Sequence, residues 1–148
     1  MKILVVDDNP KHLAAADDLV AAGHEVVRTD EYEKAIKLLN EDAQFNAILA
    51  DRSMPAEPYA LGSTGLKYLG HPIDIGYVLL IRAAQVGIRY GAILTDASHH
   101  DDPGSAAIDW IYRDMPITIN SMKAFIIHAP IKDGRKDWLA VFNQLLAS

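Results

Sequence analysis

The chain has 148 residues, of which 50% are hydrophobic and 23% are charged, and its formal net charge is −6. This length and composition are typical of one globular domain and exclude an intrinsically disordered chain. The acidic balance argues against a bare DNA-binding module, because such modules present a basic surface. The lack of cysteine excludes disulfides, thiolate metal sites and a cysteine nucleophile.

The apolar segments are too short to place the chain in a membrane. Ile3–Val6 is followed directly by two aspartates, so these four apolar residues cannot form the core of a signal peptide. The longest later apolar run, around 77–81, ends at Arg82 and is much shorter than a bilayer span. We therefore expect a cytoplasmic protein without a membrane partner.

The first third of the chain alternates between short apolar runs and segments with helical periodicity, a pattern typical of a parallel sheet with intervening helices. Asn9-Pro10 is a favourable helix start, and Gly23 is a favourable helix end. The expected order is strand 3–6, helix 9–23, strand 25–29, helix 32–40 and strand 46–50.

The rest of the chain continues this alternation after an irregular stretch. Proline and glycine are frequent between Pro55 and Pro72, which predicts a long loop with one helical turn at 66–69. The expected elements are then helix 74–87, strand 91–95, a short helix near 105–112, strand 123–128 and helix 136–146. We expect one domain over 1–148, with an extended segment at about 56–90 between the third and fourth strands.

Five strands that alternate with helices predict an α/β fold: a doubly wound, flavodoxin-like, five-stranded parallel sheet in the order 2-1-3-4-5, with helices on both faces. Such sheets bind ligands beyond the carboxyl ends of the strands where the strand order reverses, here between the first and third strands. Asp7 and Asp8 follow the first strand and Asp51 follows the third. The topology therefore predicts one acidic site.

Three carboxylates at one sheet edge repel each other unless a cation neutralises them, and Mg²⁺ is a suitable hard cation. Such a site would hold a carboxylate nucleophile and screen an incoming phosphoryl donor. A purely structural interpretation also stands, in which Asp7 is a turn residue, Asp8 caps a helix and Asp51 ends a strand.

Two segments contain recognisable motifs. Ile3–Asn9 (ILVVDDN) ends a strand with an acidic pair, and Ile48–Pro55 (ILADRSMP) contains the pattern D-x-x-M-P. Together they resemble the response-regulator receiver family of two-component signalling, in which this pair recurs and D-x-x-M-P is the phosphoacceptor motif. The resemblance is close over the first 55 residues and rests on the order of elements thereafter.

The resemblance implies roles for individual residues. Asp51 would be the phosphoacceptor, Thr95 the switch hydroxyl that bonds the phosphoryl group, and Phe125 the switch aromatic of the fifth strand. The implied Mg²⁺ ligands are Asp7, Asp8, Asp51 and the backbone carbonyl of Arg52.

The chain departs from the family at the end of the fifth strand, where receivers carry Lys-Pro. This sequence has His128-Ala129-Pro130, and His128 or Lys132 are the candidate substitutes for the missing lysine. In addition, Asp96 follows Thr95 at a position where the family usually has a small residue.

We expect a stand-alone receiver that accepts a phosphoryl group on Asp51, with Mg²⁺, from a sensor histidine kinase or phosphotransfer protein. It would signal by contact with a downstream protein, with no direct contact with nucleic acid, and would not be an enzyme beyond self-phosphorylation and self-dephosphorylation. The alternative is a pseudo-receiver, a phosphorylation-independent interaction or dimerisation module. Homodimerisation is compatible with both.

Two further groups of residues are interpreted structurally. His99-His100-Asp101-Asp102 has metal-binding residue types, but neighbouring side chains tend to diverge and no third histidine stands at ligand spacing, which favours a solvated loop. Trp110, Tyr112 and Trp138 are interpreted as packing residues rather than a stacking platform for nucleic acid. No dinucleotide-binding or P-loop motif is present.

Overall fold

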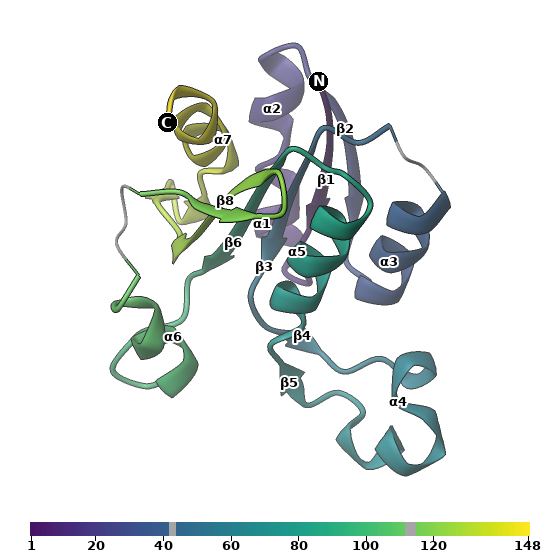
Figure 1. Cartoon of the computed structure of the whole chain (residues 1–148). Coiled ribbons are helices and arrows are strands. Elements are labelled where there is room, and N and C mark those ends of the chain that lie inside the picture. Colours follow the sequence, from purple (N-terminus) through teal and green to yellow (C-terminus); the bar gives the residue numbers. More distant parts are fainter. Residues whose placement is uncertain (42–43, 112–114) are drawn as a thin grey trace.

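The computed structural model describes residues 1–41, 44–111 and 115–148, apart from the side chains of residues 60 and 61. Its central sheet has six strands in the order β2-β1-β3-β6-β8-β7 (Figure 1). The strands are β1 (Lys2–Val6), β2 (Glu25–Thr29), β3 (Ala47–Asp51), β6 (Tyr90–Thr95), β7 (Ile117–Ile119) and β8 (Met122–His128). The five parallel strands and their order confirm the prediction. The edge strand β7, which pairs antiparallel with β8, was not predicted.

Helices cover both faces of the sheet, as predicted. Leu4 and Ile48 point into a hydrophobic cluster with residues of α3 (Tyr32–Glu41) and α5 (Ile75–Gln85). Ile3 and Leu49 point the other way, into a cluster covered by α1 (Pro10–Ala14), α2 (Asp17–Ala21) and α7 (Trp138–Ala147). Because β1 and β3 are buried on both faces, their sequences are continuous apolar runs rather than alternating ones.

The predicted helix 9–23 is divided into α1 and α2. The Asn9 side chain caps α1 by accepting from the backbone N–H of Lys11 at 3.0 Å. Around Ala15 and Ala16 the backbone hydrogen bonds change from the i−4 to the i−3 pattern, which tightens the chain and separates the two helices. Within the described residues, none of the helices is long and apolar enough to cross a bilayer.

Residues 54–73 form an arm that extends beyond the carboxyl edge of the sheet (Figure 1). The arm is more regular than the predicted loop: it contains β4 (Met54–Pro55), α4 (Pro58–Gly65), the 3₁₀ turn η1 (Leu66–Tyr68) and β5 (Pro72–Ile73). β4 and β5 pair antiparallel and close its base. Glu57 also anchors the arm, because its carboxylate accepts the backbone N–H groups of Tyr32 (2.8 Å) and Glu33 (2.9 Å) at the start of α3.

The C-terminal part contains a hairpin that the sequence analysis missed. β9 (Ile131–Lys132) and β10 (Arg135–Lys136) pair antiparallel around Asp133 and Gly134, whose φ angles are 53° and 70°. Positive φ at both central residues is characteristic of a type I′ turn, for which Asp-Gly is a preferred sequence. The closing helix therefore begins at Trp138 rather than at Lys136, after Asp137 caps it.

The predicted short helix near 105–112 is observed as α6 (Pro103–Ile108), and Tyr112 lies outside the described residues. The two tryptophans occupy opposite environments. Trp138 is fully buried in the cluster under α7, whereas the side chain of Trp110 is 90% exposed.

Gly76, near the start of α5, lies against the backbone that follows β3. Its N–H donates to the carbonyl of Arg52 at 3.0 Å. A Cβ at this position would overlap the carbonyl oxygen of Asp51 and lie 2.9 Å from the Arg52 Cα. We predict that Gly76→Ala lowers the free energy of unfolding by about 1–3 kcal/mol, the usual cost of overpacking, despite the better helix propensity of alanine.

Urea denaturation measures this change, and Gly91→Ala is the matched control. A Cβ at Gly91 would meet the ends of the Leu80 and Met122 side chains, which can move, rather than backbone atoms. The Gly91 variant should therefore lose less stability. A Gly76 variant as stable as wild type would contradict the close approach of α5 to the end of β3.

Candidate functional site

The aspartates that follow β1 and β3 meet at the carboxyl edge of the sheet. Asp7, Asp8 and Asp51 each offer a carboxylate oxygen, and these oxygens all lie within 4.8 Å of one another. Asp7 and Asp51 are 1% and 7% exposed, whereas Asp8 is exposed to solvent. The structure thus brings together the three carboxylates that the topology predicts to be neighbours.

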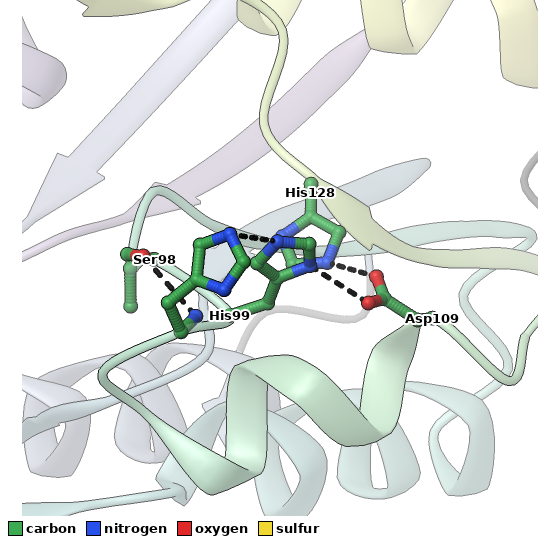
Figure 2. A pocket seen from close by; sticks show the side chains of 6 residues that line it. Ser98, His99, Asp109 and His128 are labelled. Carbon is green, nitrogen blue, oxygen red and sulfur yellow. Dashed lines mark hydrogen bonds and ion pairs between the residues drawn. The ribbon is translucent and has the colours of Figure 1, made fainter.

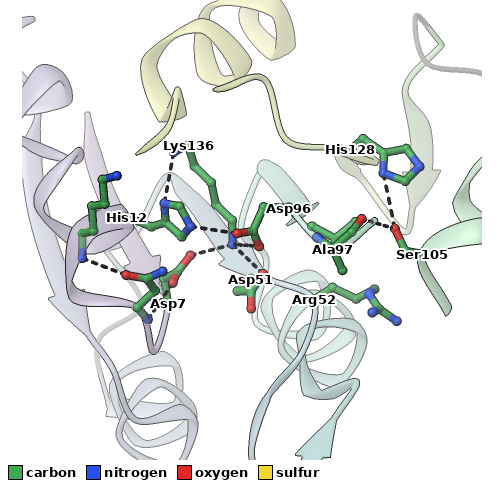
Figure 3. A network of polar contacts seen from close by, with 12 residues as sticks. Asp7, His12, Asp51, Arg52, Asp96, Ala97, Ser105, His128 and Lys136 are labelled. Atoms are coloured by element: carbon green, nitrogen blue, oxygen red, sulfur yellow. Dashed lines mark hydrogen bonds and ion pairs between the residues drawn. The ribbon is translucent and has the colours of Figure 1, made fainter. Parts of the chain in front are cut away.

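We call the site formed by Asp7, Asp8 and Asp51 the acidic pocket. Lys136 supplies a buried positive charge to it (Figure 3). Its Nζ lies 2.7 Å from Asp7 Oδ2 and 2.6 Å from Asp51 Oδ1, and the side chain is 1% exposed. A third carboxylate, that of Asp96, has its Oδ1 3.6 Å from the same Nζ. The lysine therefore bridges the ends of two neighbouring strands.

The two residues proposed from sequence as lysine substitutes lie elsewhere. Lys132 is largely exposed, and its Nζ lies 3.7 Å from Asp18 Oδ2 on α2. His128 directs its Nε2 to Asp109 at 2.9 Å. Lys132 and His128 therefore pair with residues outside the acidic pocket, and the cation that pairs with Asp7 and Asp51 is Lys136. The Asp-Gly turn was the available sequence signal, because a hairpin there returns the chain to the pocket.

His12, which the sequence analysis did not single out, holds Lys136 in place. Its Nδ1 accepts the backbone N–H of Lys136 at 3.2 Å, and its Nε2 lies 2.9 Å from Asp96 Oδ2. Because Nδ1 is an acceptor, we infer that Nε2 carries the proton and donates to Asp96. The backbone carbonyl of His12 accepts from Trp138 Nε1 at 2.8 Å, which fixes the start of α7 beside the pocket.

Burial and the neighbouring charges shift the ionisation of the pocket. Burial raises the pKa of Asp51 to about 6, and Asp7 and Asp96 add to this increase although Lys136 opposes it. Burial also raises the pKa of Asp7, against the effect of Lys136. For Lys136 burial acts in the opposite direction, but the carboxylates of Asp51 and Asp7 raise its pKa, so the ammonium stays charged.

Asp96 behaves differently from the two buried aspartates. Burial acts to raise its pKa, but Lys136 and the hydrogen bond from His12 hold the pKa below its usual value. Asp96 is therefore a charged carboxylate beside the pocket at neutral pH. It competes with Asp7 and Asp51 for the positive charge of Lys136.

The side chain of Arg52 joins the starts of two helices next to Asp51. It is 2% exposed; Nη1 lies 2.9 Å from Asp74 Oδ1 before α5, and Nη2 pairs with Asp102, which caps α6. Its backbone carbonyl, the metal ligand implied by the resemblance, accepts from Gly76 and is directed toward α5.

Thr95 and Phe125 occupy different environments. Thr95 is 3% exposed at the end of β6, one residue beyond the partner of Asp51 in the ladder, and its Oγ1 accepts from the N–H of Ala97 at 3.2 Å. Phe125 is 2% exposed and belongs to the cluster under α7 that includes Trp138. A rotamer change of this ring would require the core to repack, which distinguishes Phe125 from a surface switch residue.

Comparison with known proteins identifies the fold. No protein-family model matches the chain, and no curated protein matches it. A response regulator receiver protein from Sinorhizobium medicae WSM419 superposes with a TM-score of 0.60 at 18% identity, covering 100% of this chain and 95% of the other. The receiver domain of the hybrid histidine kinase CckA gives 0.57 at 22% identity, covering 98% and 99%. The chain therefore has the receiver-domain fold.

The raised pKa of Asp51 predicts a pH-dependent stability. Between about pH 4 and pH 6 the folded state holds a proton on Asp51 that the unfolded state has released, so stability falls as the pH rises through this range. A shift from 3.8 to about 6 corresponds to roughly 3 kcal/mol. Asp51→Asn removes this titration.

Urea denaturation of both proteins without divalent cations tests this prediction. From about pH 4 to about pH 7, wild type should lose about 3 kcal/mol relative to Asp51→Asn. The carboxyl ¹³C resonance of Asp51 should titrate near pH 6 in the folded protein. Parallel stability profiles for the two proteins would show that Asp51 titrates as an ordinary aspartate.

Proposed function

We propose that this protein is a receiver that accepts a phosphoryl group on Asp51 from a sensor histidine kinase or phosphotransfer protein and signals by protein–protein contact. The observation that carries the proposal is the ammonium group of Lys136 between Asp7 and Asp51, at the carboxyl edge of a receiver fold. This arrangement supports the proposal because it supplies the cation that the sequence had left unassigned.

The chemistry requires an ionised Asp51. An oxygen of its carboxylate attacks the phosphorus of the donor, a new O–P bond forms, and the bond between phosphorus and the donor breaks with its electron pair leaving on the donor. With a pKa of about 6, Asp51 is mostly ionised at neutral pH. Lys136 already pairs with Oδ1 of this carboxylate and can pair with a phosphoryl oxygen, whose negative charge is greater.

A divalent cation fits the same pocket. Asp7, Asp8 and Asp51 offer only carboxylate oxygens, the ligand type that Mg²⁺ prefers. Bound Mg²⁺ would neutralise the charge of the carboxylates and of the donor phosphate. Asp8 is the exposed member of the set and offers an oxygen from the solvent side.

The contacts of the pocket also suggest how phosphorylation would reach the surface. Lys136 lies at the end of the hairpin 131–136, and Asp96 begins the loop 96–102 that precedes α6. If Lys136 turns toward a phosphoryl group, its contacts with Asp7 and Asp96 weaken. The hairpin 131–136 and the loop 96–102 are exposed, and both would change conformation as these contacts weaken. They therefore offer a surface to a downstream protein.

The charge of Asp96 favours a second candidate function, the pseudo-receiver. Its carboxylate competes for Lys136 at 3.6 Å and adds negative charge where a phosphoryl dianion would bind. On this alternative, the pocket is a structural ion-pair network, and the chain binds a partner protein or a second copy without phosphorylation.

Intact-mass analysis after incubation with acetyl phosphate and Mg²⁺ separates the two functions. Wild type should gain one phosphoryl group, and Asp51→Asn or wild type with EDTA should gain none. Lys136→Met should be phosphorylated at least about tenfold more slowly, because it lacks the cation that stabilises the transferred group. Lys132→Met, which removes an exposed lysine of the same hairpin, should behave as wild type.

Three outcomes would contradict the proposal. Phosphorylation of Asp51→Asn would place the acceptor elsewhere, and equal rates for Lys136→Met and wild type would exclude a role for Lys136. Failure of wild type to gain mass with acetyl phosphate and with a panel of histidine kinases would favour the pseudo-receiver.

A further inference from the structure

A second cluster of titratable side chains lies outside the acidic pocket, at the ends of three segments distant in sequence. His99 and His100 are in the loop between β6 and α6, Asp109 follows α6, and His128 ends β8. They surround an open pocket of about 300 Å³ (Figure 2). The lining residues are Ala97, Ser98, His99, His100, Asp109 and His128.

The two sides of the Asp109 carboxylate each face an imidazole nitrogen. Nδ1 of His99 lies 2.8 Å from Oδ2, and Nε2 of His128 lies 2.9 Å from Oδ1. These hydrogen bonds hold the pKa of Asp109 below its usual value, so the carboxylate is charged at neutral pH. Two imidazole nitrogens and one charged carboxylate therefore lie next to each other at the surface.

The remaining nitrogen of each imidazole also has a polar neighbour. Nε2 of His99 lies 2.9 Å from Nε2 of His100, and Nδ1 of His128 lies 3.4 Å from the hydroxyl of Ser105. Ser105 donates its own proton to the carbonyl of Ala97 at 2.7 Å, so its oxygen is free to accept. Histidines that bind metals usually donate the other ring N–H to such a partner, which fixes the tautomer and the ring orientation.

We propose that His99 Nδ1, His128 Nε2 and the Asp109 carboxylate bind a transition-metal ion of the Zn²⁺ class, with His100 and Ser105 orienting the two imidazoles. One ligand atom from each of the three residues lies within 4.8 Å of the others. In a tetrahedral Zn²⁺ site with bonds of about 2.0–2.1 Å, ligand atoms are roughly 3.3 Å apart, so shifts of an ångström or less suffice.

The proton balance is simple. Each ring now donates to Asp109 from the nitrogen that would bind the metal. On binding, His99 moves its proton to Nε2 and donates to His100 Nε2, and His100 moves its own proton from Nε2 to Nδ1, so that its Nε2 becomes the acceptor. His128 moves its proton to Nδ1 and donates to Ser105. Both ligands stay neutral imidazoles, as metal binding requires. The fourth coordination position faces solvent, because His99 and Asp109 are 44% and 46% exposed.

This site differs in chemistry from the acidic pocket, so the inference does not depend on phosphorylation. Two imidazoles and one carboxylate select borderline metals such as Zn²⁺, whereas the carboxylate-only pocket suits Mg²⁺. A bound ion would tie together the loop after β6, the end of α6 and the end of β8. The ion would thereby stabilise one arrangement of the surface formed by these three segments.

Isothermal titration calorimetry of the tag-free full chain with Zn²⁺ tests the proposal. Millimolar Mg²⁺ is present to compete with Zn²⁺ for the carboxylate-only pocket of Asp7, Asp8 and Asp51. Wild type should bind one equivalent with a Kd in the micromolar range or tighter. His99→Asn, His128→Asn and Asp109→Asn should each raise the Kd by more than about a hundredfold, beyond the effect usual for loss of an orienting partner. His71→Asn, which changes an exposed histidine of the arm, should bind as wild type.

Co²⁺ provides a second readout that does not depend on stability. Wild type should show the visible absorption of a low-coordinate Co²⁺ site, and folded Asp109→Asn, checked by circular dichroism, should lose it. The proposal is overturned if wild type shows no saturable Zn²⁺ binding under these conditions. It is equally overturned if the three ligand variants retain wild-type affinity, since the ion would then bind elsewhere.

Discussion

The acidic pocket depends on one interaction, the ion pairs between the buried ammonium group of Lys136 and the carboxylates of Asp7 and Asp51. The two aspartates end neighbouring strands and are shielded from water, so their charges would repel strongly without a cation. Removing charges from water is costly, and the cost is offset only when the geometry and the additional hydrogen bonds are good. The hairpin and His12 provide that geometry, because they fix the backbone of Lys136 before its side chain enters the pocket.

Apolar packing and charge act on different parts of the molecule. The strands are held by hydrophobic clusters on both faces, whereas the segments after the strands are connected by polar groups. Arg52 joins the starts of α5 and α6, and His12 joins Asp96 to Lys136. A change of charge at Asp51 would therefore act first on the loops at the carboxyl edge of a rigid sheet. The proposed phosphoryl transfer is such a change.

The sequence predicted those features that depend on local pattern and topology. Strands such as 3–6 are continuous apolar runs because both faces are buried, and the topology rule placed Asp7 beside Asp51. Lys136 was missed because the helical periodicity from Leu139 onward was extended backward to Lys136, which instead ends the second strand of the Asp-Gly hairpin. The histidine cluster was missed for a different reason: His128 meets His99 and Asp109 only after β8, the loop and α6 pack together. No spacing along the chain encodes that proximity.

A double-mutant cycle between Lys136 and Asp51 tests the central claim most directly. The free energy of unfolding is measured at neutral pH without divalent cations for wild type, Lys136→Met, Asp51→Asn and the double variant. The account predicts that Lys136→Met is strongly destabilising in the wild-type background and less so in Asp51→Asn, with a coupling energy of about 1.5–3 kcal/mol. Equal costs of Lys136→Met in both backgrounds would contradict the account, because the ammonium group would then not be paired with Asp51 in solution.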